Sequence, residues 1–251
     1  KKREEESKQA KRKGPSSFLS VGLTELDNHV LENPLNELEL QRMRFCKELE
    51  QFFDKIQRNE DNIKNIRKRW ELEWVIQIGY TTQAFKASGY DRPHPLVPGR
   101  GTIEGEIEGL TIYRGHRKKL WEMGKTYISL FLPEGFAQKY PRYVIYASKM
   151  SAKHQFIPEH TDASNLAPQY HMTLGNHQGV YLECFNEDKS SVRRFATPYT
   201  VLKMDSRHPH QVVVCKNFTG VRYTLVVFIC DHNEREPLFF PPQYLPFYIQ
   251  Q

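Results

Sequence analysis

Apolar residues recur at helical spacing in the first third of the chain. Asn33 followed by Pro34 predicts a helix start, because Asn accepts a bond from an unpaired amide and proline suits the first helical position. Downstream, apolar side chains recur at steps of three, four or seven: Leu35, Leu38, Phe45, Leu49, Phe52, Ile56, Ile63, Ile66 and Trp70. This stripe predicts one helix, or two helices broken near residues 59–62, packed against a sheet. Its irregular spacing disfavours a coiled coil.

From Thr126 onward the pattern changes to short β-branched and aromatic runs that are separated by Gly, Pro, Asn and Asp. These runs predict strands at residues 127–132, 143–147, 170–174, 180–185, 200–204, 211–215 and 222–230. Their rhythm is typical of an antiparallel sandwich or jelly roll. Residues 237–251, rich in proline and aromatic side chains, are expected to form an irregular cover over a sheet edge.

The chain divides into a short polar lead-in and one larger domain. Residues 1–17 are polar and end in Gly-Pro-Ser-Ser, which predicts a disordered basic arm. Residues 18–251 are expected to form a single domain, with a helical part over about 18–78 and a jelly-roll core over about 126–251. Between these parts, residues 79–125 are rich in Gly, Pro and basic side chains. They predict either a connecting loop or a surface that meets substrate.

Composition adds a basic character to this picture. The 251 residues, of which 39% are hydrophobic, are enough to bury one full core. A net charge of +6 favours a polyanionic partner, because each neutralised phosphate releases condensed counterions. Much of that charge lies in residues 1–13, which predict either a solvated tail or an arm for nuclear import or DNA binding.

Several classes of protein are disfavoured by what the sequence lacks. No apolar run approaches the roughly eighteen residues of a membrane span, and the first residues are charged where a signal peptide is apolar. We therefore expect a soluble protein in the nucleus or elsewhere inside the cell, without a membrane partner. The four cysteines have no C-x-x-C spacing, which disfavours a disulfide framework or a zinc ribbon and predicts reduced thiols. No pattern indicates a protein partner.

Three side chains in the second half of the chain form a candidate metal site. His160 and Asp162 are two positions apart, and positions i and i+2 of a strand project to the same face. A third imidazole comes from His210, directly before an apolar strand, although His208 competes with it. We prefer His210, because Pro209 should turn the two rings apart. Two His and one carboxylate leave three coordination positions open, as oxygen activation at Fe(II) requires.

Arg222 is a second candidate for chemistry. It lies inside the apolar run of residues 221–228, so its buried charge needs a carboxylate or phosphate partner. The planar guanidinium suits a carboxylate, to which it donates two parallel hydrogen bonds. A structural salt bridge and a ligand-binding role both stay open at this point.

Residues 143–230 resemble the 2-oxoglutarate oxygenases, and within them the TET/JBP group of nucleic-acid base oxygenases. The likeness rests on His160-x-Asp162, on the late His210 and on a Gly-x-Arg-Tyr-Thr motif at residues 220–224. It implies an α+β domain whose core is a double-stranded β-helix, of the jelly-roll or cupin-like type, with N-terminal buttressing helices. It also implies that His160, Asp162 and His210 bind Fe(II).

The resemblance assigns further roles. The closing arginine of that group binds the distal carboxylate of the co-substrate 2-oxoglutarate, which implies this role for Arg222 with support from the Thr224 hydroxyl. An Asn three residues after the metal-binding Asp reaches the edge of a flipped base, and Asn165 holds that place. A His beyond the closing arginine faces the base in that group. This chain has Cys230 there, although His232 lies close by and is a candidate for substrate contact.

The activity that the resemblance implies is oxidation of a methylated nucleobase in DNA, with Fe(II), 2-oxoglutarate and O2. The base is expected to be 5-methylcytosine-like, with N6-methyladenine or thymine as alternatives. Arg114, Arg117, Lys118 and Lys119 are expected to contact phosphates. The chain lacks a cysteine-rich zinc-binding region, so it resembles the minimal fungal, protist or phage members. His171 and His177 are expected to be pocket or surface histidines.

Two other functions remain compatible with the sequence. A peptidyl hydroxylase of the prolyl-hydroxylase type shares the sandwich and the triad, but many of those enzymes have Lys where this chain has Arg222. A non-catalytic nucleic-acid-binding jelly roll that keeps its metal ligands for stability has no need of that arginine.

Overall fold

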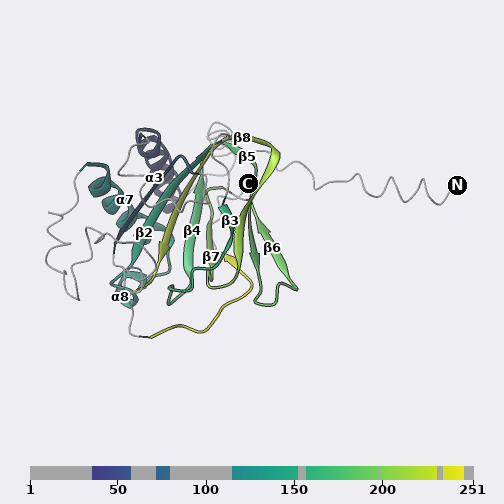
Figure 1. Ribbon diagram of the computed structural model, residues 1–251. Coiled ribbons are helices and arrows are strands. Elements are labelled where there is room, and N and C mark those ends of the chain that lie inside the picture. The colour runs from purple at the N-terminus through teal and green to yellow at the C-terminus, as the bar shows by residue number, and fades with distance from the viewer. Residues whose placement is uncertain are drawn as a thin grey trace. The chain divides into compact units, whose positions relative to one another are not determined.

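The computed structural model describes six stretches of the chain, at residues 36–57, 72–79, 115–151, 157–196, 198–230 and 234–245 (Figure 1). The expected basic arm, Arg114, His232 and most of the Gly-rich and Pro-rich stretch lie outside the described residues. None of the described helices is both long enough and apolar enough to cross a membrane. All four cysteines are free, as the sequence predicts.

The first described helix, α3, spans Glu37–Asp54. It begins after Asn36, whose side chain accepts from the Glu39 amide at 2.9 Å while the Glu39 carboxylate accepts from the Asn36 amide at 2.8 Å. The start predicted at Asn33 is therefore wrong, because this reciprocal capping box satisfies two end amides three residues later. The helix also ends before the break predicted near residues 59–62, which lie outside the described residues.

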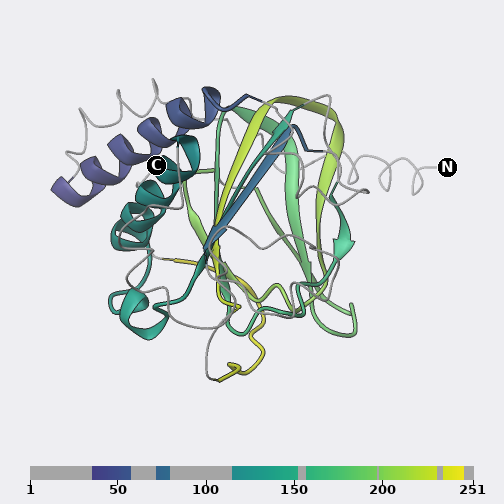
Figure 2. The ribbon, with the colours of Figure 1, turned by 60° about the vertical axis from the view of Figure 1, so that its left-hand side comes forward.

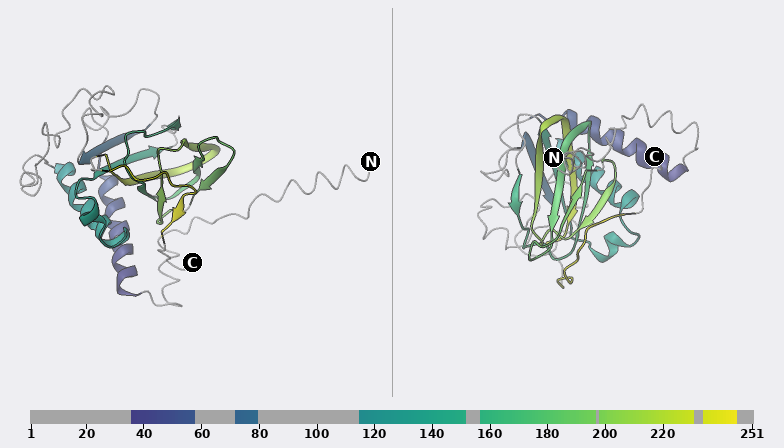
Figure 3. Two further views of the ribbon diagram at one scale, coloured as in Figure 1. Left: turned by 90° about the horizontal axis from the view of Figure 1, so that it is seen from below. Right: turned by 90° about the vertical axis from the view of Figure 1, so that its right-hand side faces the viewer.

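Helix α7 spans Gly115–Phe131, and the short helix α8 spans Phe136–Lys139. The strand predicted at 127–132 and the loop predicted up to 125 are both wrong here. Leu120, Tyr127 and Phe131 are buried and separated by steps of seven and four, which is helical spacing. The window 127–132 alone is a short apolar and aromatic run like that of a buried strand, and the residues before it decide for the helix. Helices α3 and α7 lie side by side (Figure 3).

The strands of the described chain all pair antiparallel and form two groups that share one strand. They are β1 Trp74–Gly79, β2 Val144–Ser151, β3 Ile157–His160, β4 Gln169–Leu174, β5 His177–Phe185, β6 Val192–Phe195, β7 Val201–Met204, β8 His210–Phe228 and β9 Gln243–Tyr244. One group has the order β1-β2-β8-β4-β7-β9, and the other has β3-β8-β5-β6. This interleaving is the topology of a double-stranded β-helix, so the predicted α+β, jelly-roll fold class is confirmed.

Strands β1, β3, β6 and β9 are not among the seven strand ranges that the sequence predicts. Strand β1 lies in the part predicted to be helical, and all six of its residues are buried, so no polar alternation marks it. Strand β9 pairs with β7 at a sheet edge, whereas the neighbouring residues 235–242 carry no regular structure. The tail therefore covers an edge as predicted, but it does so partly by adding a strand.

Strand β8 is one bent strand of 19 residues rather than the two strands predicted (Figure 2). Its first part pairs with β3 and β5, and its second part pairs with β2 and β4. The change of partner falls at Gly220, whose φ is +80° and where a Cβ would lie 1.7 Å from the Asn176 carbonyl oxygen. Only glycine allows this close approach, so Gly220 lets one strand serve both sheets.

The close backbone approach at Gly220 should make this position sensitive to substitution. Gly220→Ala is expected to lower the free energy of unfolding by more than the roughly 1–2 kcal/mol that a left-handed conformation costs a non-glycine residue. Gly135→Ala is the matched control, because Gly135 has φ +78° but no atom lies within 4 Å of the place that a Cβ would take. Urea unfolding of both variants compares the two losses. Equal losses would contradict a steric role for Gly220.

Side chains that alternate along β8 pack into different apolar clusters on the two faces of the strand. One cluster joins α3 and α7 to one sheet face, and it contains Tyr223, Leu225 and Val227. The other lies between the two sheets and contains Ile157, Leu182 and Val212, among others. Because strand side chains alternate, the even-numbered residues of β8 from 222 to 228 face the space between the sheets, where the cavity lies.

Candidate metal centre

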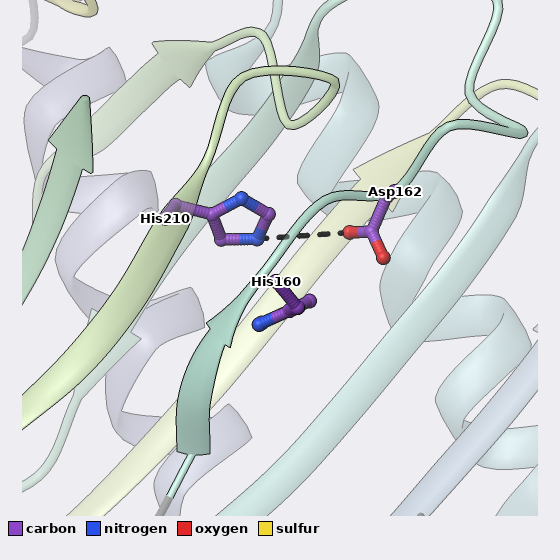
Figure 4. Close-up of side chains that lie close together, drawn as sticks. All are labelled: His160, Asp162 and His210. Carbon is purple, nitrogen blue, oxygen red and sulfur yellow. Dashed lines mark ion pairs between the residues drawn. The ribbon is translucent and has the colours of Figure 1, made fainter. Parts of the chain in front are cut away.

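His160, Asp162 and His210 lie close together at one end of the space between the sheets (Figure 4). One ligand atom from each side chain lies within 4.8 Å of the others, and His210 Nε2 is 3.7 Å from Asp162 Oδ2. His160 ends β3 and pairs in register with His210, which begins β8. Asp162 lies beyond the strand rather than on it, and its backbone amide donates to the Ser206 carbonyl at 2.8 Å.

Backbone carbonyls fix the tautomer of both imidazoles. His160 Nδ1 is 2.7 Å from the Pro158 carbonyl oxygen, and His210 Nδ1 is 3.0 Å from the His208 carbonyl oxygen. A carbonyl only accepts, so each Nδ1 carries a proton, and in the neutral imidazole Nε2 then keeps a lone pair. This is the arrangement in which outer hydrogen bonds orient metal-binding histidines. Together with the Asp162 carboxylate, which is 26% exposed, the three groups suit a divalent cation.

The competing His208 is placed differently. Its ring packs edge-on against Phe240, with the ring centroids 5.6 Å apart, and it does not line the cavity. It reaches the cluster only through its carbonyl oxygen. The geometry therefore gathers His210 with the other two side chains, and His208 supports the His210 ring from behind.

The three side chains line one cavity that extends between the two sheets. Ile157, Leu182 and Val212 provide an apolar wall between the sheets. Arg222 and Thr224 line the same cavity from the second part of β8. The cavity thus joins a candidate metal centre to a buried guanidinium.

Arg222 is 3% exposed, and its Nη2 lies 3.5 Å from His171 Nε2. Among the described residues, no carboxylate pairs with it. Burial lowers the pKa of Arg222 to about 10, with a smaller opposing contribution from Tyr146, so the guanidinium stays charged at neutral pH. A buried charge without a partner is very costly. This site therefore favours a bound anion, and the structural salt bridge left open by the sequence is not formed within the described chain.

Thr224 adds a second polar group without a partner on the same wall. Its Oγ1 is buried and makes no hydrogen bond within the described chain. It lies two positions beyond Arg222, on the same face of β8. A carboxylate placed here can accept from both side chains, so the residues present fit an organic acid that reaches from Arg222 toward the metal centre.

The two other histidines near Arg222 carry no charge at neutral pH. Burial, followed by the nearby Arg222 charge, lowers the pKa of His171 well below its usual value. The same causes lower the pKa of His177 to about 3. His171 lines the cavity, whereas His177 is buried outside it. Arg222 is therefore charged at neutral pH, whereas the two histidines beside it are neutral.

Asn165 lies at the metal-centre end of the cavity and is 1% exposed. Its Nδ2 donates to Ser206 Oγ at 2.6 Å, and its Oδ1 accepts from the Cys230 thiol at 3.4 Å. Both polar atoms of the amide are thus engaged within the protein. A base contact by Asn165 stays a prediction, for which the Oδ1 atom can accept a second hydrogen bond.

Three of the four basic residues expected to contact phosphates lie on helix α7 rather than on a loop. Lys118 and Lys119 are exposed in the first turns of α7. Arg117 is half-buried, and its Nη1 lies 3.4 Å from the Gln77 carbonyl oxygen. The fourth of these residues, Arg114, precedes the described helix.

Sequence reasoning missed several residues that line the cavity. Gln77, Tyr146, Ser148 and Gln169 all contribute to its walls. Gln77 carried a usable signal, because it is the one polar side chain in the otherwise apolar run Trp-Val-Ile-Gln-Ile. Ser148 and Tyr146 alternate with apolar residues on β2, which assigns them to one face once the strand is known.

Comparisons with known proteins add little at the level of sequence. No family model matches the chain, and no curated protein matches it. Solved structures with partial likeness include an oxidoreductase of the 2OG-Fe(II) oxygenase family from Burkholderia pseudomallei. It is 17% identical, with 62% of this chain and 66% of that chain covered and a TM-score of 0.35.

Two further structures are of the same kind. NgTET1 in complex with 5mC DNA is 18% identical over 74% of this chain and 67% of its own, with a TM-score of 0.36. A prolyl-4-hydroxylase from Pseudomonas putida is 12% identical over 77% of this chain and 86% of its own, with a TM-score of 0.40.

Proposed function

We propose that this protein is an Fe(II)- and 2-oxoglutarate-dependent dioxygenase. His160, Asp162 and His210 hold Fe(II), while Arg222 and Thr224 anchor the distal carboxylate of 2-oxoglutarate. The observation that carries the proposal is one cavity that joins the two-His, one-Asp cluster to a buried arginine without a carboxylate partner in the described chain.

Each end of the cavity supports a different part of this proposal. Two His and one carboxylate leave coordination positions open for a chelating oxo acid and for O2. When bound, Fe(II) and 2-oxoglutarate supply the oxidising chemistry. The protein orients the imidazoles through the Pro158 and His208 carbonyls. The apolar wall between the sheets excludes water from the space where the oxo acid would lie.

For the substrate, we propose a methylated base in DNA. The net charge of +6 and the exposed Lys118 and Lys119 support a polyanionic partner. Asn165 lines the cavity next to Asp162, where a flipped base would enter. The principal rival is a peptidyl hydroxylase, which uses the same iron chemistry on a peptide.

One experiment tests the activity and the substrate together. Purified protein is incubated with Fe(II) and 2-oxoglutarate, and with methylated duplex DNA, methylated RNA or a proline-rich peptide. Succinate is quantified in each reaction, and the nucleosides and peptide are examined by mass spectrometry. We expect Fe(II)-dependent succinate in each reaction and an oxidised nucleoside from DNA.

The outcomes separate the alternatives. A hydroxylated peptide with unmodified nucleosides would assign the protein to the rival class. Oxidised nucleosides from RNA alone would correct the substrate. No succinate under any condition, from a folded protein, would contradict the dioxygenase proposal itself.

A further inference from the structure

A buried ion pair lies in the turn between β7 and β8, beside the candidate metal centre. The Arg207 and Asp205 side chains are 3% and 0% exposed. Arg207 Nε donates to Asp205 Oδ1 at 2.7 Å, and Arg207 Nη2 donates to Asp205 Oδ2, so the pair is bidentate. A buried pair of this kind is a weak source of stability, because desolvation offsets much of its attraction. Its geometry is nevertheless rigid.

Backbone carbonyls of the turn that contains this pair form hydrogen bonds with two of the three candidate metal ligands. The Ser206 carbonyl accepts from the Asp162 amide at 2.8 Å. The His208 carbonyl faces His210 Nδ1 at 3.0 Å. The orientations of Asp162 and His210 therefore depend on where this turn lies. His160 is independent of it, because its ring is held by the Pro158 carbonyl.

A segment near the C-terminus fixes the turn from its other side. Arg207 Nη1 donates to the Glu236 carbonyl at 2.7 Å, and Nη2 donates to the Pro237 carbonyl at 3.0 Å. The Phe239 amide donates to Asp205 Oδ2 at 3.1 Å. The Glu236 amide in turn donates to the Leu166 carbonyl, which lies in the loop that follows Asp162. Residues 236–239 are thus bonded to both loops that carry the candidate ligands.

We propose that Asp205 and Arg207 are positioning residues of the metal centre, and that residues 236–239 brace it through them. The pair acts on the metal through the Ser206 and His208 carbonyls, without touching it. The segment 236–239 comes after β8 in the sequence, and it would stabilise a site whose three ligands all precede it. This inference rests on the proposed metal site.

The test uses Co(II) binding by the full chain, without any substrate. The variants are Arg207→Met, which keeps an unbranched apolar stem but removes the fork, and Arg207→Lys, which restores the charge without the fork. Arg42→Met is the matched control, because Arg42 Nε donates to the Leu130 carbonyl at 2.6 Å on the helical side of the domain. Co(II) affinity and the visible absorption spectrum of bound Co(II) are measured well below the melting temperature of each variant.

We expect Arg207→Met to lose about 10- to 100-fold in Co(II) affinity, as supporting groups of metal sites commonly do. Arg207→Lys should lose less, and Arg42→Met should bind like the wild type. The Co(II) spectrum of the Arg207 variants should change, because two ligands are released from their fixed geometry. Asp205→Asn, which keeps the shape of the pair, should show a smaller loss in the same direction and serves if Arg207→Met does not fold.

Three other outcomes would contradict either the metal site or the positioning role. Wild-type protein that binds no Co(II) would contradict the proposed metal site itself. Wild-type binding, with unchanged affinity and spectrum in folded Arg207 or Asp205 variants, would overturn the positioning role and leave the metal site standing. A lower melting temperature alone, with unchanged Co(II) binding, would mark the pair as merely structural.

Discussion

Replacing His160, Asp162 or His210 by alanine is expected to abolish Fe(II)-dependent succinate production. Each side chain supplies one of only three protein ligands, so its loss removes a bond that the neighbouring residues do not replace. Carbonyl oxygens hold both imidazoles in the metal-binding orientation, whereas the ring of the competing His208 packs against Phe240. Succinate release at saturating 2-oxoglutarate, measured over a range of Fe(II) concentrations, gives the result.

His208→Ala is the matched control for these variants. Its ring packs on Phe240 and lies outside the cavity, while the carbonyl that holds His210 belongs to the backbone and survives the substitution. Activity should therefore persist with a modest loss. An inactive His208→Ala enzyme beside an active His210→Ala enzyme would reverse the ligand assignment.

Arg222→Met is expected to separate stability from co-substrate binding. Without ligand, the substitution removes a buried charge that has no carboxylate partner in the described chain, so the unfolding free energy should stay equal or rise. The apparent affinity for 2-oxoglutarate should fall by roughly 10- to 100-fold, the range for losing charge-assisted hydrogen bonds. 2-Oxoglutarate should raise the melting temperature of the wild type but not of the variant.

Two further variants calibrate this effect. Arg222→Lys keeps the charge but not the fork, so it should bind 2-oxoglutarate more weakly than the wild type and recover turnover at high concentration. Thr224→Val removes the hydroxyl that lacks a partner and should cause a smaller loss of affinity. If Arg222→Met destabilised the free protein and left 2-oxoglutarate binding unchanged, Arg222 would have a structural partner instead.

The parts of the fold that sequence predicts well are those with local patterns. Strands β4, β5 and β7 contain short apolar and aromatic runs; the predicted bounds of β4 and β7 agree within one residue, and β5 begins three residues earlier than predicted. The alternation within residues 222–228 places Arg222 and Thr224 on one face, because a strand has a period of two. The spacing of His160 and Asp162 can be recognised in the sequence for a similar reason. In the structure, however, Asp162 lies beyond the strand and is positioned by a hydrogen bond to the β7–β8 turn.

The parts that escaped prediction depend on contacts between distant residues. Strand β1 is buried on both faces, so its composition does not distinguish a strand from a core helix. Gly220 looks like a turn between two strands, and only the approach to the Asn176 carbonyl reveals a bend within one. The hydrogen bonds by which Asp205 and Arg207 would position the metal centre join three segments that are distant in the sequence, so no local pattern predicts them.

The central claim is that one cavity binds Fe(II) at one end and a carboxylate of 2-oxoglutarate at the other. Anaerobic calorimetric titration of 2-oxoglutarate into the protein, with and without Fe(II), measures this directly. We predict saturable one-to-one binding that tightens when Fe(II) is present, loses this Fe(II) dependence in Asp162→Ala and is weakened in Arg222→Met with or without Fe(II). Binding that ignores both Fe(II) and Arg222, or no binding to the folded wild type, would contradict the account.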